Sequence, residues 1–407
     1  MNVSELRSIN LFSSTLTLFT RPANRKTTIM SPFTVPIRVG LIGLSAGGGW
    51  APVSHLPYLK SSSKYTITAV CNSSIESSRK AIEQYDLEQS AAAYDSVESM
   101  CDSDTVDLVV CVVVVFSHYK LVKPAIERGK NVYVEWPLCG TTEEAKELAQ
   151  LAKQKGVRTI IGFQSRVGHI HSTLQGILDS GRIGRVLASH IVGSSITPET
   201  GNRLDKRYLY FKERHAEGTK GQVTLTIYVG HTMDFVASLL GQPRTVSAQL
   251  QTTWPLVTIL DGDEIIESHV PKSADDYASL HGVTSTGVKY TYVLRGGEAF
   301  QEGDGLVWDI IGEKGQIRVT GGTIMFNIGA DNYKIQVKDY ANGNIETIPL
   351  HEKLPLPLLA QNVGMVYEKF ADGEIVPTFE DAVRRHEFLD AMFASDENGG
   401  SVQALKN

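Results

Sequence analysis

The sequence predicts two domains: a doubly wound parallel α/β sheet, followed by an α+β domain whose sheet is mostly antiparallel. Three observations lead to this prediction. An apolar segment at 37–44 runs directly into a cluster of glycines. Apolar strands then alternate with helical segments up to about residue 158, and this alternation requires parallel strands joined by right-handed crossovers. Beyond residue 159, segments that alternate apolar and polar residues are joined by glycine-rich turns, as in antiparallel sheets.

Local signals place each element of the first domain, residues 35–158. Pro124 lies inside a helical segment and predicts a kink or an early turn. Thr141 and Glu144 can form a capping box, and the helix that follows ends before Gly156. The expected strands are 37–44, 65–71, 131–135 and the wholly apolar run 108–116, which indicates a central strand buried on both faces; the expected helices are 74–85, 119–128 and 142–155.

The second domain, residues 159–395, is expected to combine a few helices with a larger sheet. A final helix at 381–393 is expected to pack back on the first domain, and residues 396–407 form a tail. The remaining expected helices are 170–180 and 223–240, and the expected strands are 186–193, 245–253, 279–294 and 306–319.

Residues 1–34 differ in composition from the rest, because they are rich in Ser, Thr, Arg and Asn and contain Glu5 as their only acid. A mitochondrial presequence has this character, and so does a disordered extension. Met30 also lies just before the folded pattern begins, which fits an upstream start codon. We expect a disordered extension or a start-site artefact and a cytoplasmic protein, with mitochondrial targeting as the alternative.

Composition excludes several classes of function. The chain of 407 residues is 42% hydrophobic and 21% charged, as in ordinary globular proteins. Its formal net charge of −6 offers no basic field for direct contact with nucleic acid. No apolar run reaches the roughly 18 residues that span a membrane. The four cysteines form no Cys-x-x-Cys pair, so we expect free thiols and no metal site.

The glycine cluster after the first strand is typical of a dinucleotide-binding turn. Such turns bring backbone close to a pyrophosphate, and the next helix offers unpaired N–H groups to it. The motif departs from Gly-x-Gly-x-x-Gly, because serine stands at the middle glycine position, and an ordinary strand–helix turn is the alternative. The predicted cofactor contacts here are Gly43, Leu44, Ser45, Ala46 and Gly48.

The end of the second strand bears on cofactor choice. An acidic residue there usually holds the ribose hydroxyls of NAD, but this chain has Asn72 and Ser73. Both side chains could bond a 2′-phosphate, and Arg79 or Lys80 lies within reach. The sequence therefore predicts an NAD(P) site with a preference for NADP(H).

Several blocks, in order along 36–395, resemble the glucose–fructose oxidoreductase / inositol dehydrogenase (Gfo/Idh/MocA) family. Residues 129–138 resemble its Gly-Lys-x-Val-x-x-Glu-Lys-Pro-Leu segment except at Trp136. The other matching blocks are His118, 162–166, 181–186, 230–234 and 377–382. Segments 43–46, 49–50, 54–57, 134–136 and 228–232 are most similar to the fungal branch that contains the galactose-regulon repressor, which binds NAD(P) and covers a transcriptional activator.

The resemblance implies a Rossmann-type first domain and a set of site residues. In active members a Lys and a His–Asp pair handle the substrate proton, but here Trp136 replaces the Lys and Ile227 replaces the Asp. His231 remains as the candidate general acid/base, and a buried, structurally satisfied histidine is the alternative. Glu135 is expected to position the cofactor or Trp136, or to be a simple strand-end carboxylate. The cofactor contacts added by the resemblance are Val114, His118, Glu135, Trp136 and Arg166.

Two functions therefore stay open at this point. The first is an NAD(P)-dependent oxidoreductase that acts on a small carbonyl, alcohol or carbohydrate-like substrate, with His231 and Glu135 as its catalytic residues. The second is a catalytically silent, dinucleotide-sensing regulator with a transcription factor as partner. The resemblance also implies a homodimer formed through the open face of the second sheet. Tyr208, Tyr210, Lys212 and Tyr228 are further polar candidates near His231, and we expect them to be structural.

Overall fold

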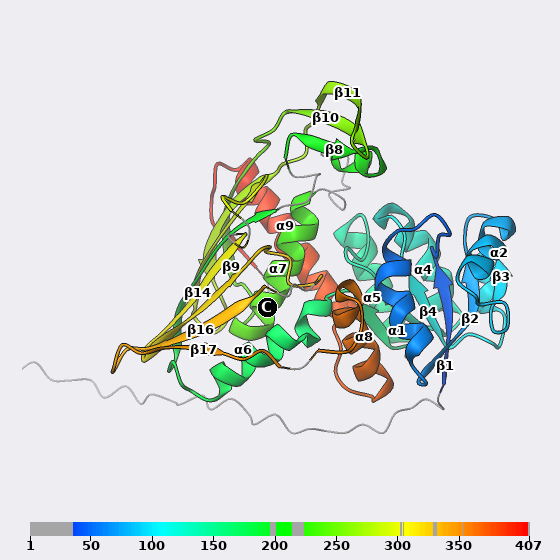
Figure 1. The fold of residues 1–407 in the computed structure, drawn as a ribbon, viewed down its shortest axis with the longest axis horizontal. Coiled ribbons are helices and arrows are strands. Elements are labelled where there is room, and N and C mark those ends of the chain that lie inside the picture. Colours follow the sequence, from blue (N-terminus) through cyan, green and yellow to red (C-terminus); the bar gives the residue numbers. More distant parts are fainter. Residues whose placement is uncertain are drawn as a thin grey trace, which may run out of the picture.

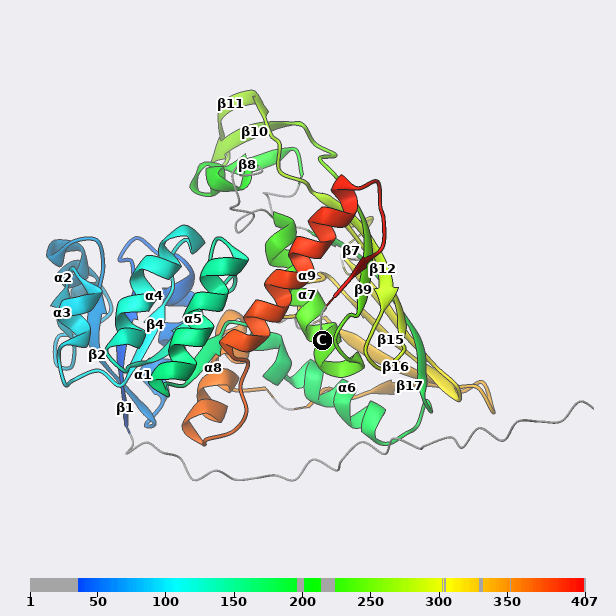
Figure 2. The same cartoon turned by 180° about the vertical axis from the view of Figure 1, so that it is seen from behind.

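The computed structural model describes residues 36–195, 201–213, 224–301, 303, 305–328, 332–351 and 353–405. Two domains lie side by side, and helices of the second domain lie between its sheet and the first domain (Figures 1 and 2). The predicted extension at 1–34 lies outside the described residues.

The first domain contains a six-stranded parallel sheet in the order β3-β2-β1-β4-β5-β6. This confirms the predicted doubly wound sheet, and its order reverses between β1 and β4. The strands are β1 (Ile37–Ile42), β2 (Tyr65–Cys71), β3 (Ala92–Tyr94), β4 (Leu108–Cys111), β5 (Asn131–Val134) and β6 (Thr159–Ile161). Around the sheet lie η1 (Ala51–His55), α1 (Leu56–Ser61), α2 (Ile75–Gln84), α3 (Val97–Cys101), η2 (Val115–Ser117), α4 (His118–Glu127) and α5 (Thr142–Lys155).

Capping explains where α2 and α5 begin and where α5 ends. The Ser74 hydroxyl accepts from the Ser77 backbone N–H at the start of α2. Thr141 caps α5 in the same way by accepting from the Glu144 N–H, and Gly156, with φ of 66°, ends the helix. Pro124 lies inside α4, as expected.

The apolar run 108–116 is not the single strand that the sequence predicts. β4 ends at Cys111, because the neighbouring strands β1 and β5 end at the same level, at Ile42 and Val134. Residues 113 and 114 then line a cavity, and the chain turns into η2.

The second domain contains a nine-stranded sheet in the order β17-β16-β15-β14-β7-β13-β12-β9-β18. Its strand pairs are antiparallel except β7 with β13, which confirms the predicted mostly antiparallel sheet. The expected strands 279–294 and 306–319 are each two strands joined by a turn. The strands are β7 (Val186–Ser195), β9 (Thr245–Gln251), β12 (Tyr277–Val283), β13 (Lys289–Gly296), β14 (Leu306–Gly312), β15 (Gly315–Gly321), β16 (Lys334–Asp339), β17 (Ile345–Ile348) and β18 (Gln403–Ala404).

Two smaller groups complete the domain. A three-stranded sheet that the sequence did not predict projects beside the gap between the domains; it contains β8 (Arg203–Asp205), β10 (Leu256–Asp261) and β11 (Glu264–Pro271), with η5 (Lys206–Phe211) attached (Figure 1). The 3-10 turn η3 (Gln164–Val167) follows β6. The helices of the second domain are α6 (His169–Asp179), α7 (Thr224–Leu240), α8 (Leu358–Ala371) and α9 (Phe379–Glu397).

The C-terminal helices join the two domains. α9 packs against α5, where the Thr142 hydroxyl donates to Asp390 at 2.5 Å, as the sequence predicted for the last helix. α8 was not predicted, and its Val363 and Tyr367 share one buried core with Ile37 of β1. β6 pairs with β5, so the expected boundary at 158/159 separates the first sheet from its own last strand.

Two features were sought in the part of the chain that the structure describes. None of its helices combines the length and the hydropathy needed to cross a bilayer. No group of three or more His, Cys, Asp or Glu side chains within it is placed to hold a metal ion. The four cysteines are buried free thiols, as expected.

Candidate functional site

A cavity of about 860 Å³ lies at the carboxyl ends of β1, β2 and β4, where the strand order reverses. In open α/β sheets this position is the usual ligand crevice, and the volume is within the common range for ligand sites, about 300–1,000 Å³. Six of the predicted contacts line it: Gly43, Ser45, Ala46, Asn72, Ser73 and Val114.

Gly43 shapes the floor of the cavity. Its φ is +89°, and a Cβ at this position would lie 2.3 Å from the Val112 carbonyl oxygen and 2.5 Å from Val113 Cγ1. Because both the conformation and the contact exclude a side chain, the chain can leave β1 at this angle only with glycine.

Ser45 organises the turn that follows. Its hydroxyl accepts from the Gly47 N–H at 3.1 Å, its carbonyl accepts from the Gly48 N–H at 3.2 Å, and Tyr85 donates to the same carbonyl at 2.8 Å. Gly48 and Gly49 have φ of +97° and +116° with open space around them. The serine at the middle glycine position therefore stabilises the turn through its own side chain.

Asn72 and Leu44 support this turn from behind. The Asn72 side-chain N–H donates to the Leu44 carbonyl at 2.8 Å and to the Ser77 carbonyl at 3.3 Å, while the Leu44 side chain is buried. The Asn72 nitrogen is thus already engaged within the protein. Gly48, another predicted cofactor contact, belongs to the turn that Ser45 organises.

The cavity wall beside α2 combines charges of both signs. Ser77 and Lys80 line it together with Ser73, and Asp95 after β3 and Glu98 in the first turn of α3 line it as well. Sequence reasoning found no acid at the end of β2 and missed these two, because they follow a different strand. Ser96, Ser117, Lys120 and Leu121 were also missed.

Glu135 lies just after β5 and is held from two sides. His55 Nε2 lies 2.9 Å from Glu135 Oε1, and the Gln164 side-chain N–H lies 2.9 and 2.8 Å from the two carboxylate oxygens. His55 Nδ1 lies 2.8 Å from the Tyr367 hydroxyl on α8. A Cβ on Gly162 would meet Glu135 at 2.7 Å, so this glycine leaves room for the carboxylate.

Trp136 packs closely against α7. Its indole N–H donates to the Thr226 carbonyl at 3.2 Å, and its ring centroid is 4.8 Å from those of both Phe163 and His386. A Cβ on Gly230 would lie 2.4 Å from the indole nitrogen, so Gly230 makes this packing possible. The tryptophan therefore fills the position implied for lysine with a buried aromatic surface.

His231 lies close to this aromatic group, with its ring 5.9 Å from that of Phe163. Burial lowers the pKa of His231 to about 4, although the Glu135 carboxylate acts in the opposite direction. The imidazole is therefore neutral at pH 7. Its Nδ1 is buried and has no hydrogen-bond partner among the described residues.

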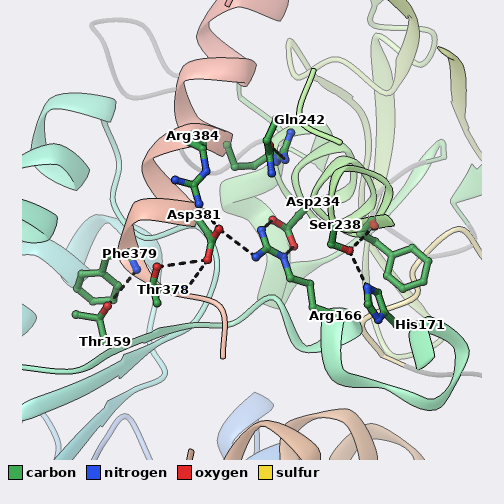
Figure 3. Close-up of polar contacts among 12 residues, drawn as sticks. Thr159, Arg166, His171, Asp234, Ser238, Gln242, Thr378, Phe379, Asp381 and Arg384 are labelled. Atoms are coloured by element: carbon green, nitrogen blue, oxygen red, sulfur yellow. Dashed lines mark hydrogen bonds and ion pairs between the residues drawn. The ribbon is translucent and has the colours of Figure 1, made fainter. Parts of the chain in front are cut away.

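Two predicted cofactor contacts have other partners. His118 is buried, with Nδ1 2.9 Å from the Pro137 carbonyl and Nε2 3.0 Å from the Val113 carbonyl. Arg166 forms a two-bond pair with Asp234, at 2.6 and 2.5 Å, and its Nη1 lies 3.0 Å from Asp381 (Figure 3). Both side chains are occupied by internal contacts, and neither lines the cavity.

The remaining polar candidates are dispersed. The Tyr228 side chain is buried within α7, and Lys212 pairs with Glu213. The Tyr210 side chain lies outside the described residues. Ile227, at the position implied for Asp, is partly buried and packs against the main core.

Comparisons with known proteins agree with this architecture. Residues 37–163 match the oxidoreductase family with an NAD-binding Rossmann fold, and residues 171–321 match the C-terminal domain of Gal80p. Dehydrogenase aclE of Aspergillus oryzae is 30% identical over 382 residues, which cover 89% of this chain and 97% of that protein. The galactose/lactose metabolism regulatory protein GAL80 of Saccharomyces cerevisiae is 29% identical over 312 residues, which cover 73% and 70%.

Solved structures extend the comparison. A super-repressor mutant of Gal80p from Saccharomyces cerevisiae superposes with a TM-score of 0.81 at 25% identity, covering 91% of this chain and 97% of that one. Levoglucosan dehydrogenase in complex with NADH and levoglucosan gives a TM-score of 0.72 at 18% identity, covering 91% and 100%. The second likeness concerns the fold alone.

Proposed function

Because the chain belongs to the Gfo/Idh/MocA oxidoreductase family, we propose that it binds a pyridine dinucleotide in the cavity and transfers hydride to or from a small carbonyl, alcohol or carbohydrate-like substrate. The observation that carries the proposal is the Gly43 turn at the cavity floor, where a side chain would collide with the Val112 carbonyl. Glu135 follows β5 and contacts His55, and His231 lies within α7 beside Phe163.

The residues present fit a dinucleotide. The glycines at 48 and 49 leave the backbone open beside the cavity, and a helical turn begins at Ala51. Free backbone N–H groups at such a position favour a bound pyrophosphate. Ser73 and Lys80 offer donors to a 2′-phosphate. We therefore propose NADP(H) as the preferred cofactor, although Asp95 and Glu98 line the same cavity.

His231 supplies the proton chemistry in this proposal. A bound dinucleotide supplies or accepts the hydride. Since burial keeps His231 neutral at pH 7, its imidazole can accept the proton of a substrate hydroxyl when an alcohol is oxidised. His55 and Gln164 fix the carboxylate of Glu135, and this negative charge acts electrostatically on the His231 imidazole. Trp136 has no proton to give at neutral pH and serves as an apolar wall.

A second function is favoured by specific observations. Trp136 stands where the resemblance implies lysine in active members, and it packs against Gly230 and His386. Residues 171–321 match the C-terminal domain of Gal80p. A catalytically silent regulator that binds a dinucleotide and a transcription activator fits both observations.

One set of measurements separates the two functions. NADPH and NADH binding is titrated by nucleotide fluorescence, and turnover is then followed with a panel of ketones, aldehydes, sugars and alcohols. The oxidoreductase proposal expects turnover that His231→Gln lowers by roughly 10²–10⁴-fold while the dinucleotide Kd is unchanged. His171→Gln is the matched control, because desolvation also lowers the pKa of His171 to about 4.

The outcomes that oppose the proposal are distinct. Tight dinucleotide binding without turnover by the wild-type chain, together with co-precipitation of a transcription activator, supports the regulator. Absence of heat with all four pyridine nucleotides in calorimetry overturns both functions.

A further inference from the structure

A second, much smaller cavity lies beside α9 on the side of the second domain. Its volume is about 20 Å³, and Gln242 and Pro243 after α7 line it together with Arg384 and Arg385 on α9. Leu405, the last described residue, also lines this cavity. This cavity is separate from the dinucleotide cavity and shares no lining residue with it.

Arg385 is a buried cation with unused donors. Its side chain is only 1% exposed, and its single hydrogen bond within the described residues runs from Nη2 to Gln242 Oε1 at 3.3 Å. Its Nε and Nη1 atoms are buried without a partner among those residues. A guanidinium carries five N–H donors, and leaving buried donors unpaired is unfavourable.

The neighbouring carboxylates are already used by other arginines. Asp234 forms two bonds with Arg166, while Asp381 is shared between Arg166 and Arg384 (Figure 3). The Arg384 side chain is 47% exposed, so solvent compensates part of its charge, and neither carboxylate forms a hydrogen bond with the buried Arg385. Buried charges normally have a counter-charge, so the unpaired donors of Arg385 point to a missing anion.

Glu387 does not supply that counter-charge. It also lines the small cavity, but its carboxylate lies 2.8 Å from Lys146 on α5. Burial lowers the pKa of Arg385 to about 10, so the guanidinium is still charged at pH 7.

We propose that the cavity beside Arg385 binds one monatomic anion of the size of chloride. A cavity of about 10–15 Å³ by the same measure admits a single water, so 20 Å³ admits one particle of atomic size. Phosphate and organic carboxylates are too large for this volume. The anion would accept from Nε or Nη1 of Arg385 and neutralise the charge of this side chain, and the proposal does not depend on the function proposed above.

Two measurements test the site on the full chain. Thermal unfolding is followed in sodium chloride, sodium bromide and sodium gluconate at constant ionic strength, because gluconate cannot enter the cavity. Chloride and bromide are expected to raise the Tm in a saturable way, by roughly 1–3 °C, since a ligand of the folded state stabilises it. Crystals soaked in bromide are expected to show an anomalous peak within hydrogen-bonding distance of Arg385.

Matched variants make the test specific. Arg385→Met keeps the apolar stem and removes the charge, so it is expected to abolish the difference between chloride and gluconate. Arg182→Met, at an exposed pair with Glu346, is expected to retain that difference. If Arg385→Met does not fold, the bromide peak in the wild-type crystal still decides. Equal Tm values in chloride and gluconate, or a cavity without an anomalous peak, would show that it holds water and would overturn the proposal.

Discussion

Gly43 shows how one backbone position determines the shape of the cavity. Gly43→Ala adds a Cβ 2.3 Å from the Val112 carbonyl at a φ of +89°. We expect the free energy of unfolding to fall by about 1–3 kcal/mol, because strain of this kind has that cost. We also expect the dinucleotide Kd to rise at least ~10-fold, since a shift of about 1.4 kcal/mol in binding suffices for that change. Urea unfolding and fluorescence titration measure the two effects.

Gly156→Ala is the control for this variant. Gly156 also has a positive φ, of 66°, but it ends α5 and has open space around it. It is expected to lower stability by about 1 kcal/mol and to leave the dinucleotide Kd unchanged. Equal effects of the two variants on Kd would contradict the role given to Gly43.

Buried histidines predict how stability depends on pH. Burial lowers the pKa of His171 and His231 to about 4 and that of His386 to about 3, whereas the unfolded value is about 6.5. The unfolded chain therefore binds more protons between pH 6.5 and pH 4, and stability falls as the pH falls through this window. Each histidine contributes a slope of up to about 1.4 kcal/mol per pH unit.

His386→Phe tests this dependence. The substitution retains the ring contact with Trp136 and removes one titrating group. The free energy of unfolding is therefore expected to decline less steeply between pH 6.5 and pH 4, because about one proton fewer is taken up on unfolding. Urea unfolding at several pH values measures the slope. The same substitution at His190, whose side chain is exposed on β7, is the control. An unchanged slope for His386→Phe would refute the assignment.

At the scale of elements, Arg166 joins three parts of the domain interface. It lies in η3 and pairs with Asp234 on α7 and Asp381 on α9 (Figure 3). Asp234 is fully buried, and burial raises its pKa while Arg166 opposes that rise. The pair therefore holds the helices together only while both partners are present.

Arg166→Met is expected to lower the free energy of unfolding by about 3–5 kcal/mol, because it leaves a buried carboxylate unpaired. The double variant with Asp234→Leu is expected to lose less than the single variant, since no buried charge then lacks a partner. Arg128→Met, which removes an exposed pair with Asp102, is expected to cost no more than about 1 kcal/mol. Chemical denaturation distinguishes these cases, and additive losses would argue against the coupling.

Elements with local signals were predicted well, and those set by neighbours were not. The sequence predicted β2 at 65–71 and both ends of α5. The alternation of side chains in a strand and the caps of a helix depend on residues that are adjacent in the chain. The end of β4 at Cys111 depends on where its two neighbouring strands stop. α8 begins after Pro357 without a side-chain cap, so no local signal marked its start.

The candidate site divides in the same way. The Gly43 turn was visible as a sequence motif, and six predicted contacts line the cavity. Asp95 was missed because it reaches the cavity from another strand, and the pairing of Arg166 with Asp234 joins residues 68 positions apart. Such contacts follow from tertiary packing and leave no local pattern.

At the scale of the whole molecule, the large sheet keeps an apolar row uncovered. Val192 on β7 lies opposite Val307 on β14 and is 56% exposed, while Val307 is 40% exposed. Val293 on β13 is paired with Val192 on the other side. We predict that this face forms a homodimer, because contiguous exposed apolar surface of this kind commonly marks an interface.

The dimer prediction is tested by Val192→Glu combined with Val307→Glu. Two carboxylates in the row oppose burial, so analytical ultracentrifugation is expected to show a monomer for the variant and a dimer for the wild-type chain. Ile375→Glu is the control, because Ile375 is 89% exposed in the connection after α8. A monomeric wild-type chain would reject the prediction.

The packing of α8 against β1 has a consequence for how the chain matures. Tyr367 and Val363 complete a core that begins with Ile37, yet they are translated about 200 residues after β6. At about 5–20 residues per second, the ribosome needs roughly 10–40 s for that stretch. During this interval the nascent amino-terminal half exposes the apolar patch that α8 later shields. We therefore expect it to engage chaperones, and an expression plasmid that stops before α8 to yield inclusion bodies.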